Sequence, residues 1–210
     1  MSEGLARRLG TGDAVVVGLS AMIGAGVFAA FAPAAAAAGP WLLAALALAA
    51  VVAYCNATSS ARLAALYPES GGTYVYGRRR LGPFWGYLAG WGFTVGKTAS
   101  CAAMALTFGA YVAPGLSVAV VVLLLVADLR GAIGFSSFGV LVYYAIANAA
   151  ALTLTREEGA PPKVVPVVGV VLCLVLAATL PWGSVVAGLA VFAVGALVWV
   201  AVHHRRSARP

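Results

Sequence analysis

The feature that most constrains this chain is a series of apolar runs long enough to cross a lipid bilayer. They extend over about residues 14–38, 41–65, 84–113, 132–154, 164–180 and 184–202. Charged residues make up only 9% of the chain and hydrophobic residues 63%, whereas a soluble domain carries about 25% charged residues. Since a helix needs roughly 20 apolar residues to span the membrane core, the sequence predicts an all-α integral membrane protein. A soluble fold and a disordered chain are both excluded.

A further apolar run, residues 116–127, is too short to cross the bilayer alone. As a helix it would rise about 18 Å, against a hydrocarbon core of about 30 Å. Basic clusters flank the longer runs, at Arg7 and Arg8, Arg78–Arg80, Arg156 and Lys163, and the tail from Arg205. Because cytoplasmic loops are rich in Lys and Arg, we predict six full transmembrane helices plus this short segment, seven helices in all. Both termini are then cytoplasmic.

Composition also narrows the classes of function. The net charge of +7 comes from clusters beside apolar runs, not from a solvated basic face with interleaved aromatics, so we expect no nucleic-acid partner. Cys55, Cys101 and Cys173 lie far apart within apolar runs and predict neither a metal site nor a disulfide framework. The sequence contains no catalytic triad, phosphate-binding loop or zinc-ligand spacing, so we expect no enzyme, no metal and no cofactor.

The first candidate site lies inside the first apolar run. Its residues are Ile23, Gly24, Ala25, Gly26, Val27 and Phe28. Two glycines are costly in a helix interior, and an unwound backbone within a membrane is tolerated where it lines a cavity. A helix broken here would turn free N–H groups toward an anion such as a substrate carboxylate. Close packing of small residues against another helix remains the alternative.

Lys97 is the second candidate. It is one of two lysines in the chain and lies well inside the third apolar run, with no acidic residue near it in sequence. A lysine within a membrane span is costly and indicates a functional site by default. Burial would suit it to proton coupling or to pairing with an anion. Snorkelling of the side chain to the membrane surface is the alternative.

Glycines also recur at helical spacing at the start of the third run. They are Gly82, Gly86 and Gly90, with Gly92 and Gly96 beside them. Small residues at this spacing allow two membrane helices to approach closely. We expect this glycine stripe to pack against another helix, either within the chain or in a second copy of it.

Three blocks of sequence resemble the amino acid–polyamine–organocation (APC) superfamily of permeases. Residues 23–28 resemble the broken G-x-G-[IV]-F segment of the family's first span. Residues 67–76 read like the loop P-x-[AS]-G-G-x-Y-x-Y, and residues 81–91 like the G-P-x-x-G start of the third span. The family implies about twelve spans, built as a five-plus-five inverted repeat with two extra helices.

This chain resembles such a permease without its middle spans. Residues 1–113 resemble the first three spans with the broken first helix, and residues 132–210 resemble the last three spans and a basic tail. Residues 114–131 would form a short hydrophobic junction. The resemblance implies that residues 23–26 offer backbone groups to a substrate carboxylate, and that Val27 and Phe28 open the second half-helix. The family's sixth helix, which completes the site, has no counterpart.

The resemblance implies uptake of an amino acid or related amine across the cytoplasmic membrane, with proton symport as the expected coupling. Two alternatives stay open. In one, the shortened chain does not transport and is either a remnant or a partner subunit of a full-length permease. In the other, a homo-oligomer in the lipid bilayer rebuilds the transport pathway.

Overall fold

The computed structural model describes residues 10–22, 31–112 and 129–207, which form helices joined by turns and short loops, with no strand among them. The elements are α1 (Thr11–Met22), α3 (Phe31–Ala38), the 3-10 helix η1 (Gly39–Trp41), α4 (Leu42–Leu66), α5 (Thr73–Arg80), α6 (Pro83–Val112), α8 (Leu129–Leu152), α9 (Val164–Ala178) and α10 (Trp182–Ser207). The prediction of an all-α protein is confirmed for this part of the chain. The whole of the predicted short run 116–127 lies outside the described residues, as does most of the predicted junction.

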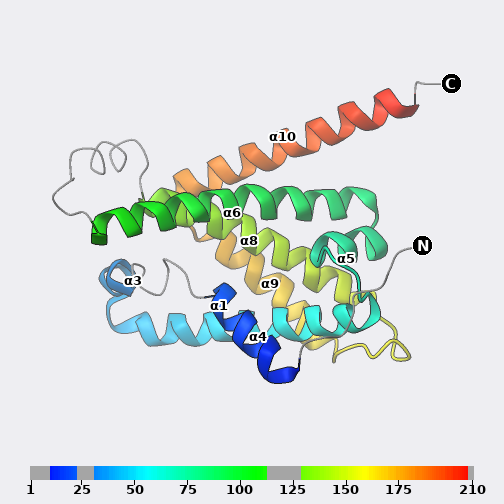
Figure 1. Ribbon diagram of the computed structural model, residues 1–210, viewed down its shortest axis with the longest axis horizontal. Coiled ribbons are helices and arrows are strands. Elements are labelled where there is room, and N and C mark those ends of the chain that lie inside the picture. The colour runs from blue at the N-terminus through cyan, green and yellow to red at the C-terminus, as the bar shows by residue number, and fades with distance from the viewer. Residues whose placement is uncertain (1–9, 23–30, 113–128, 208–210) are drawn as a thin grey trace.

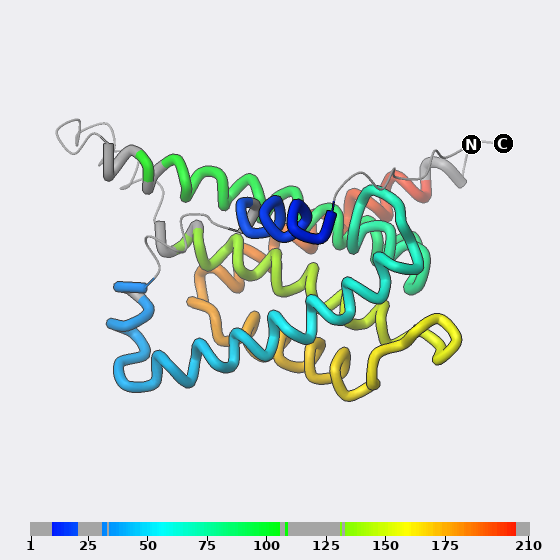
Figure 2. Tube along the Cα trace, turned by 60° about the horizontal axis from the view of Figure 1, so that its bottom comes forward, coloured from blue at the N-terminus to red at the C-terminus, as the bar shows by residue number. Residues whose placement is uncertain are grey.

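The five helices α4, α6, α8, α9 and α10 form a bundle in which successive members run in alternating directions (Figure 1). The end of α6 and the start of α8 lie at the same end of the bundle in both views (Figures 1 and 2). The short helix α5 and the loop between α8 and α9 lie at the opposite end. Such alternation is what consecutive bilayer crossings require, since each crossing carries the chain to the opposite side of the membrane and the next one brings it back.

Three stretches of the described residues are long and apolar enough to span a membrane. They are Ala34–Leu66, Ile133–Leu152 and Trp182–His204. The helix α6 has 30 residues but is not among them, because glycines, Lys97 and hydroxyl side chains dilute its apolar content. The helix α9 has 15 residues, about 22 Å of rise. Length and hydropathy therefore support three full spans among the described helices, where the sequence predicted six in the whole chain.

The core of the bundle joins helices from the first half of the chain to helices from the second half. One cluster packs Leu63 of α4 and Tyr76 of α5 against Ala150 of α8. A second packs Val52 of α4 against Cys173 of α9. Large apolar side chains remain exposed on the outside of α4, α9 and α10, as expected of a surface that meets lipid. The predicted N-terminal and C-terminal segments thus form one packed body.

The glycine stripe of α6 is used for packing inside this body. At Gly86 an added Cβ would lie 2.7 Å from a backbone oxygen of α5. A Cβ at Gly92 would clash with the ring of Phe192 on α10, and one at Gly96 would lie 3.4 Å from the backbone of α8. These three glycines therefore let α5, α8 and α10 approach α6. They are not a free surface for a second copy of the chain.

Candidate functional site

The predicted binding segment, residues 23–28, lies outside the described residues, between α1 and α3. The helix α1 is exposed along nearly its whole length, and α3 packs against η1 and α4. The role of Ile23, Gly24, Ala25, Gly26, Val27 and Phe28 in substrate binding therefore stays a prediction.

Lys97 is exposed on α6, not buried as the sequence predicted. Its Nζ lies 5.8 Å from the ring centroid of Phe93, within the range of a cation–π interaction. That ring in turn lies 5.1 Å from the ring of Tyr143 on α8. Among the described residues no carboxylate forms an ion pair with this ammonium. The expectation of burial assumed helices on every side of α6, and no described helix covers the side that carries Lys97.

The loop before α5, which carries the second of the three sequence blocks, docks on α8 at Gly72. Gly72 has a φ of +53°, which favours glycine, and a Cβ there would lie 2.9 Å from the hydroxyl of Tyr143. This close approach lets the backbone N–H of Thr73 donate a hydrogen bond of 3.1 Å to that hydroxyl. In the described structure, Gly72 therefore positions the start of α5.

A buried polar contact crosses the middle of the bundle. The hydroxyl of Ser59 on α4 donates a hydrogen bond of 2.7 Å to Oδ1 of Asn148 on α8. The Nδ2 of Asn148 donates one of 2.9 Å to the carbonyl of Tyr144. Both Ser59 and Asn148 are fully buried, and Gly169 on α9 leaves room for the amide, since a Cβ there would clash with it. Buried polar groups need such partners, most of all inside a membrane.

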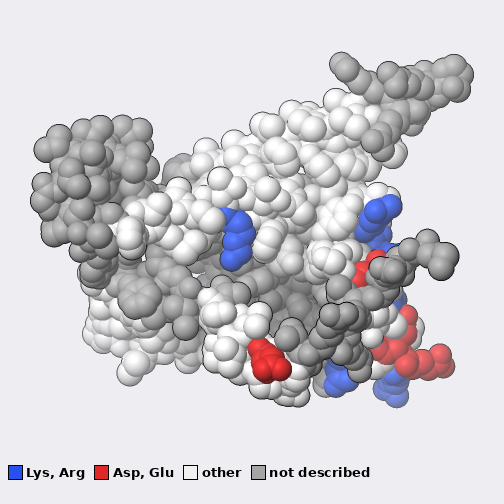
Figure 3. All heavy atoms as spheres, in the orientation of Figure 1, with Lys and Arg blue, Asp and Glu red and all other residues white. Residues whose placement is uncertain are grey.

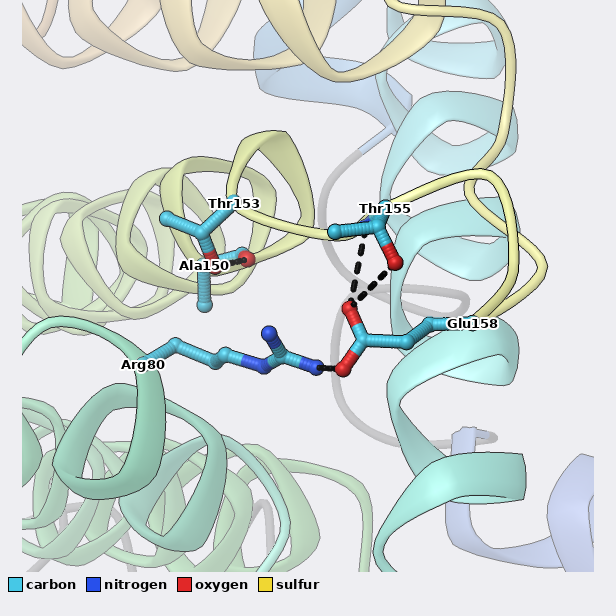
Figure 4. A network of polar contacts seen from close by, with 5 residues as sticks. All are labelled: Arg80, Ala150, Thr153, Thr155 and Glu158. Atoms are coloured by element: carbon cyan, nitrogen blue, oxygen red, sulfur yellow. Dashed lines mark hydrogen bonds and ion pairs between the residues drawn. The ribbon is translucent and has the colours of Figure 1, made fainter.

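An ion pair closes the arginine-rich end of the bundle (Figure 4). Nη2 of Arg80 lies 2.5 Å from Oε1 of Glu158, and the two side chains are 13% and 29% exposed. The other oxygen of Glu158 accepts hydrogen bonds from the backbone N–H and the hydroxyl of Thr155, at 2.9 and 3.2 Å. The guanidinium of Arg80 also lies 5.4 Å from the ring centroid of Tyr67.

These contacts shift the charge equilibria of the pair. The hydrogen bond from Arg80, together with that from the Thr155 backbone, lowers the pKa of the Glu158 carboxyl to about 2. The hydrogen bond to Glu158 in turn raises the pKa of Arg80. Both groups are therefore charged at neutral pH.

The ion pair also places two loops at one end of the molecule. It joins residues 67–82 to residues 153–163, the two internal loops whose basic residues were expected on one side of the membrane. A second pair, between Arg79 and Glu69 at 3.0 Å, lies on the surface of the first loop. Figure 3 shows most charged side chains of the visible face gathered at this end, while the rest of the described part of that face carries few charges.

The sequence did not predict the partners of Ser59, Tyr143 and Glu158. Ser59 and Tyr143 lie within apolar runs, and Glu158 lies in the charged loop between two of them. The one available signal was the presence of polar residues within apolar runs, which marks them as in need of a partner without saying which.

A helical bundle with a largely apolar outer surface, three stretches long enough to cross a bilayer and a basic end defines a membrane protein. The family profile described as Amino acid permease matches residues 13–155 of the chain, more than half of its length. The chain therefore belongs to the amino acid permease family.

Several transporters are similar to part of the chain. An uncharacterized transporter of Mycobacterium tuberculosis (strain ATCC 25618 / H37Rv) is 75% identical over 123 residues, which are 59% of this chain and 28% of that protein. The glutamate/serine transporter AimA of Bacillus subtilis (strain 168) is 40% identical over 88 residues, 41% of this chain and 16% of the transporter. The branched-chain amino acid permease BcaP of the same strain is 29% identical over 109 residues, 52% of this chain and 23% of the permease.

The matched part of the chain thus spans 28% or less of each of these relatives. No solved structure matches the chain significantly.

Proposed function

We propose that this chain is a shortened permease that carries an amino acid or a related amine across the cytoplasmic membrane, driven by protons. The observation that carries the proposal is the family match over residues 13–155, which includes the predicted binding segment. The names of two relatives, a glutamate/serine transporter and a branched-chain amino acid permease, support an amino acid as the substrate.

In this proposal the first apolar run binds the substrate. The backbone groups of Ile23, Gly24, Ala25 and Gly26 receive the carboxylate, because free N–H groups at a helix break favour an anion. Val27 and Phe28 begin the second half of the helix. Lys97 is the proton-coupling residue, and its exposed side of α6 is covered in the membrane by a second copy of the chain.

The proposed organisation has an N-terminal permease segment of residues 1–113, a hydrophobic junction of residues 114–131 and a C-terminal permease segment of residues 132–210. The contacts between α4 and α8 and between the two loops support the pairing of the outer segments. The basic residues of both loops favour the cytoplasmic side for that end, by the positive-inside rule.

A second function stays open on a specific observation. Lys97 forms no ion pair with any described residue, and it faces away from the bundle. Both facts favour a non-transporting partner subunit that docks on a full-length permease. A degenerate remnant is the limiting case.

Uptake by proteoliposomes separates these functions. The purified chain is reconstituted and supplied with a mixed pool of labelled amino acids, with and without an inward proton gradient, beside protein-free liposomes. Gradient-driven accumulation supports the permease. Absence of uptake by folded, inserted protein contradicts it and favours the partner subunit.

A further inference from the structure

A hollow at the arginine-rich end lies between α5, the start of α6 and the end of α10. Its walls combine basic and aromatic side chains with aliphatic ones. They include Tyr74 and Arg78 from α5, Tyr87 from α6, and Trp199, Val202 and His203 from α10. No part of the proposed transport site uses these residues.

Arg78 supplies the hollow with a charge that the described structure does not neutralise. Of the three successive arginines, Arg79 pairs with Glu69 and Arg80 pairs with Glu158. Arg78 is exposed and forms no ion pair with any described residue. An arginine that forms no ion pair within the described part of the chain is available to an external anion, and its planar fork suits phosphate.

The position of this arginine is fixed by close packing. A Cβ at Gly86 of α6 would lie 2.6 Å from Cβ of Arg78, so the two backbones meet almost directly. A Cβ at Gly90 would lie 3.1 Å from the ring of Tyr74. The start of α6 carries a partial positive charge and lies beside the part of α5 that carries Arg78. It therefore strengthens the local preference for an anion.

The opposite wall of the hollow is apolar and aromatic. The ring of Trp199 stacks on that of His203 at a centroid distance of 4.6 Å and meets Phe84 edge-on at 5.2 Å. Further along α10 the apolar surface continues as exposed side chains such as Val198 and Val194. A ligand that fits both walls has an anionic head and a long apolar tail, and aromatic residues of this kind mark the depth of lipid headgroups.

We propose that this hollow binds an anionic phospholipid, with the phosphate at Arg78 and an acyl chain along the outer face of α10. Basic pockets between membrane helices on the cytoplasmic side recognise acidic headgroups in this way. The site does not depend on the transport function, because none of its residues belongs to the proposed substrate pathway.

Native mass spectrometry of the full chain in detergent tests the proposal. The chain is equilibrated with phosphatidylglycerol or with phosphatidylcholine of the same acyl chains, and bound lipid is counted. We expect the wild type to retain phosphatidylglycerol in preference, and Arg78→Gln to weaken that retention roughly fivefold. Arg78→Lys should keep most of it. Arg156→Gln, an exposed arginine of the neighbouring loop outside the hollow, should leave it unchanged.

Three outcomes would overturn the proposal. The first is equal retention of both lipids by the wild type, a result that does not depend on whether any variant folds. The second is an equal loss in Arg78→Gln and Arg156→Gln, which would indicate a diffuse charge effect. The third is displacement of the lipid by millimolar inorganic phosphate, which would assign the hollow to a soluble anion.

Discussion

The hydroxyl of Ser59 and the side-chain amide of Asn148 meet in the centre of the bundle, with Oγ and Oδ1 2.7 Å apart. Ser59 belongs to the segment that resembles the first spans of a permease, and Asn148 to the segment that resembles the last spans. Their contact is fully buried, so neither group can exchange its partner for water. The contact therefore joins α4 of the N-terminal permease segment to α8 of the C-terminal permease segment within one bundle.

Ser59→Ala should destabilise the protein because it leaves Oδ1 of Asn148 without its donor. Interhelical hydrogen bonds in membranes are worth about 0.6 kcal/mol on average and up to about 1.7, and we expect the upper part of that range because the site is dry. Unfolding in a graded mixture of detergent and SDS measures the change. Ser60→Ala, at the next and only half-buried position, is the control, and an equal loss there would contradict the prediction.

Gly169→Ala should destabilise the packing of α9 on α8. The added methyl group would clash with the amide of Asn148, and overpacking of this kind costs about 1–3 kcal/mol. The same unfolding assay applies. The matched control is Gly183→Ala at the start of α10, where a Cβ would meet nothing within 4 Å. A wild-type midpoint for Gly169→Ala would show that α8 and α9 are not packed this closely.

The Arg80–Glu158 pair predicts a pH dependence of stability. The pKa of Glu158 is lowered from an ordinary 4.5 to about 2 in the folded protein, so the folded state favours the ionised carboxylate. Its contribution is therefore fully present above about pH 5 and is lost as the pH falls toward 2.

Comparison of the wild type with Glu158→Gln across this range checks the prediction. The two unfolding midpoints should differ at pH 7 and converge toward pH 2. Glu157→Gln, an exposed neighbour without an ion pair among the described residues, should follow the wild type throughout. A difference that is constant with pH would contradict the role of the carboxylate charge.

Lys97→Ala should lower the rate of gradient-driven uptake at least tenfold if the lysine couples transport to protons. Lys163→Ala removes the only other lysine of the chain, in a loop outside the spans, and should transport normally. Facilitated exchange without a gradient should survive in Lys97→Ala, because substrate binding uses other residues. Unchanged gradient-driven uptake would refute the coupling role.

Gly26→Leu should abolish both exchange and gradient-driven uptake. A large side chain at this position would block close approach of the substrate to the backbone. The fluorescence of a fused reporter measures expression and membrane insertion, and it serves as the control for folding. Normal uptake would contradict the assignment of residues 23–28 as the binding segment.

Hydropathy predicted the long helices well. The run predicted at residues 41–65 is observed as α4 (Leu42–Leu66), and that at 84–113 as α6 (Pro83–Val112). Gly39-Pro40 and Gly82-Pro83 mark where these two helices begin, so their starts are visible in the sequence. The sequence did not predict the helix α5, because its residues form no long apolar run. Its position depends on contacts with α6 and α8.

Pairings between distant residues could not be predicted in the same way. Arg78, Arg79 and Arg80 form one basic cluster in the sequence, yet one lines a hollow and two pair with different carboxylates. Which partner each finds depends on the turn at Gly72 and on the register between α5 and α8. Lys97 shows the converse case, since a central position in an apolar run did not place it inside the bundle.

Disulfide crosslinking in membranes tests most directly whether the two outer segments form one bundle. Ser59→Cys and Asn148→Cys, at the contact of two short side chains, are combined in a chain whose three native cysteines are replaced by alanine, and mild oxidation follows. We predict an intramolecular crosslink, seen as a mobility shift of the monomer that reductant reverses. Ser60→Cys with Asn148→Cys, one position along α4 and outside the buried contact, should crosslink far less. No crosslink, or one found only between copies, would contradict the pairing of the segments on which the proposed permease rests.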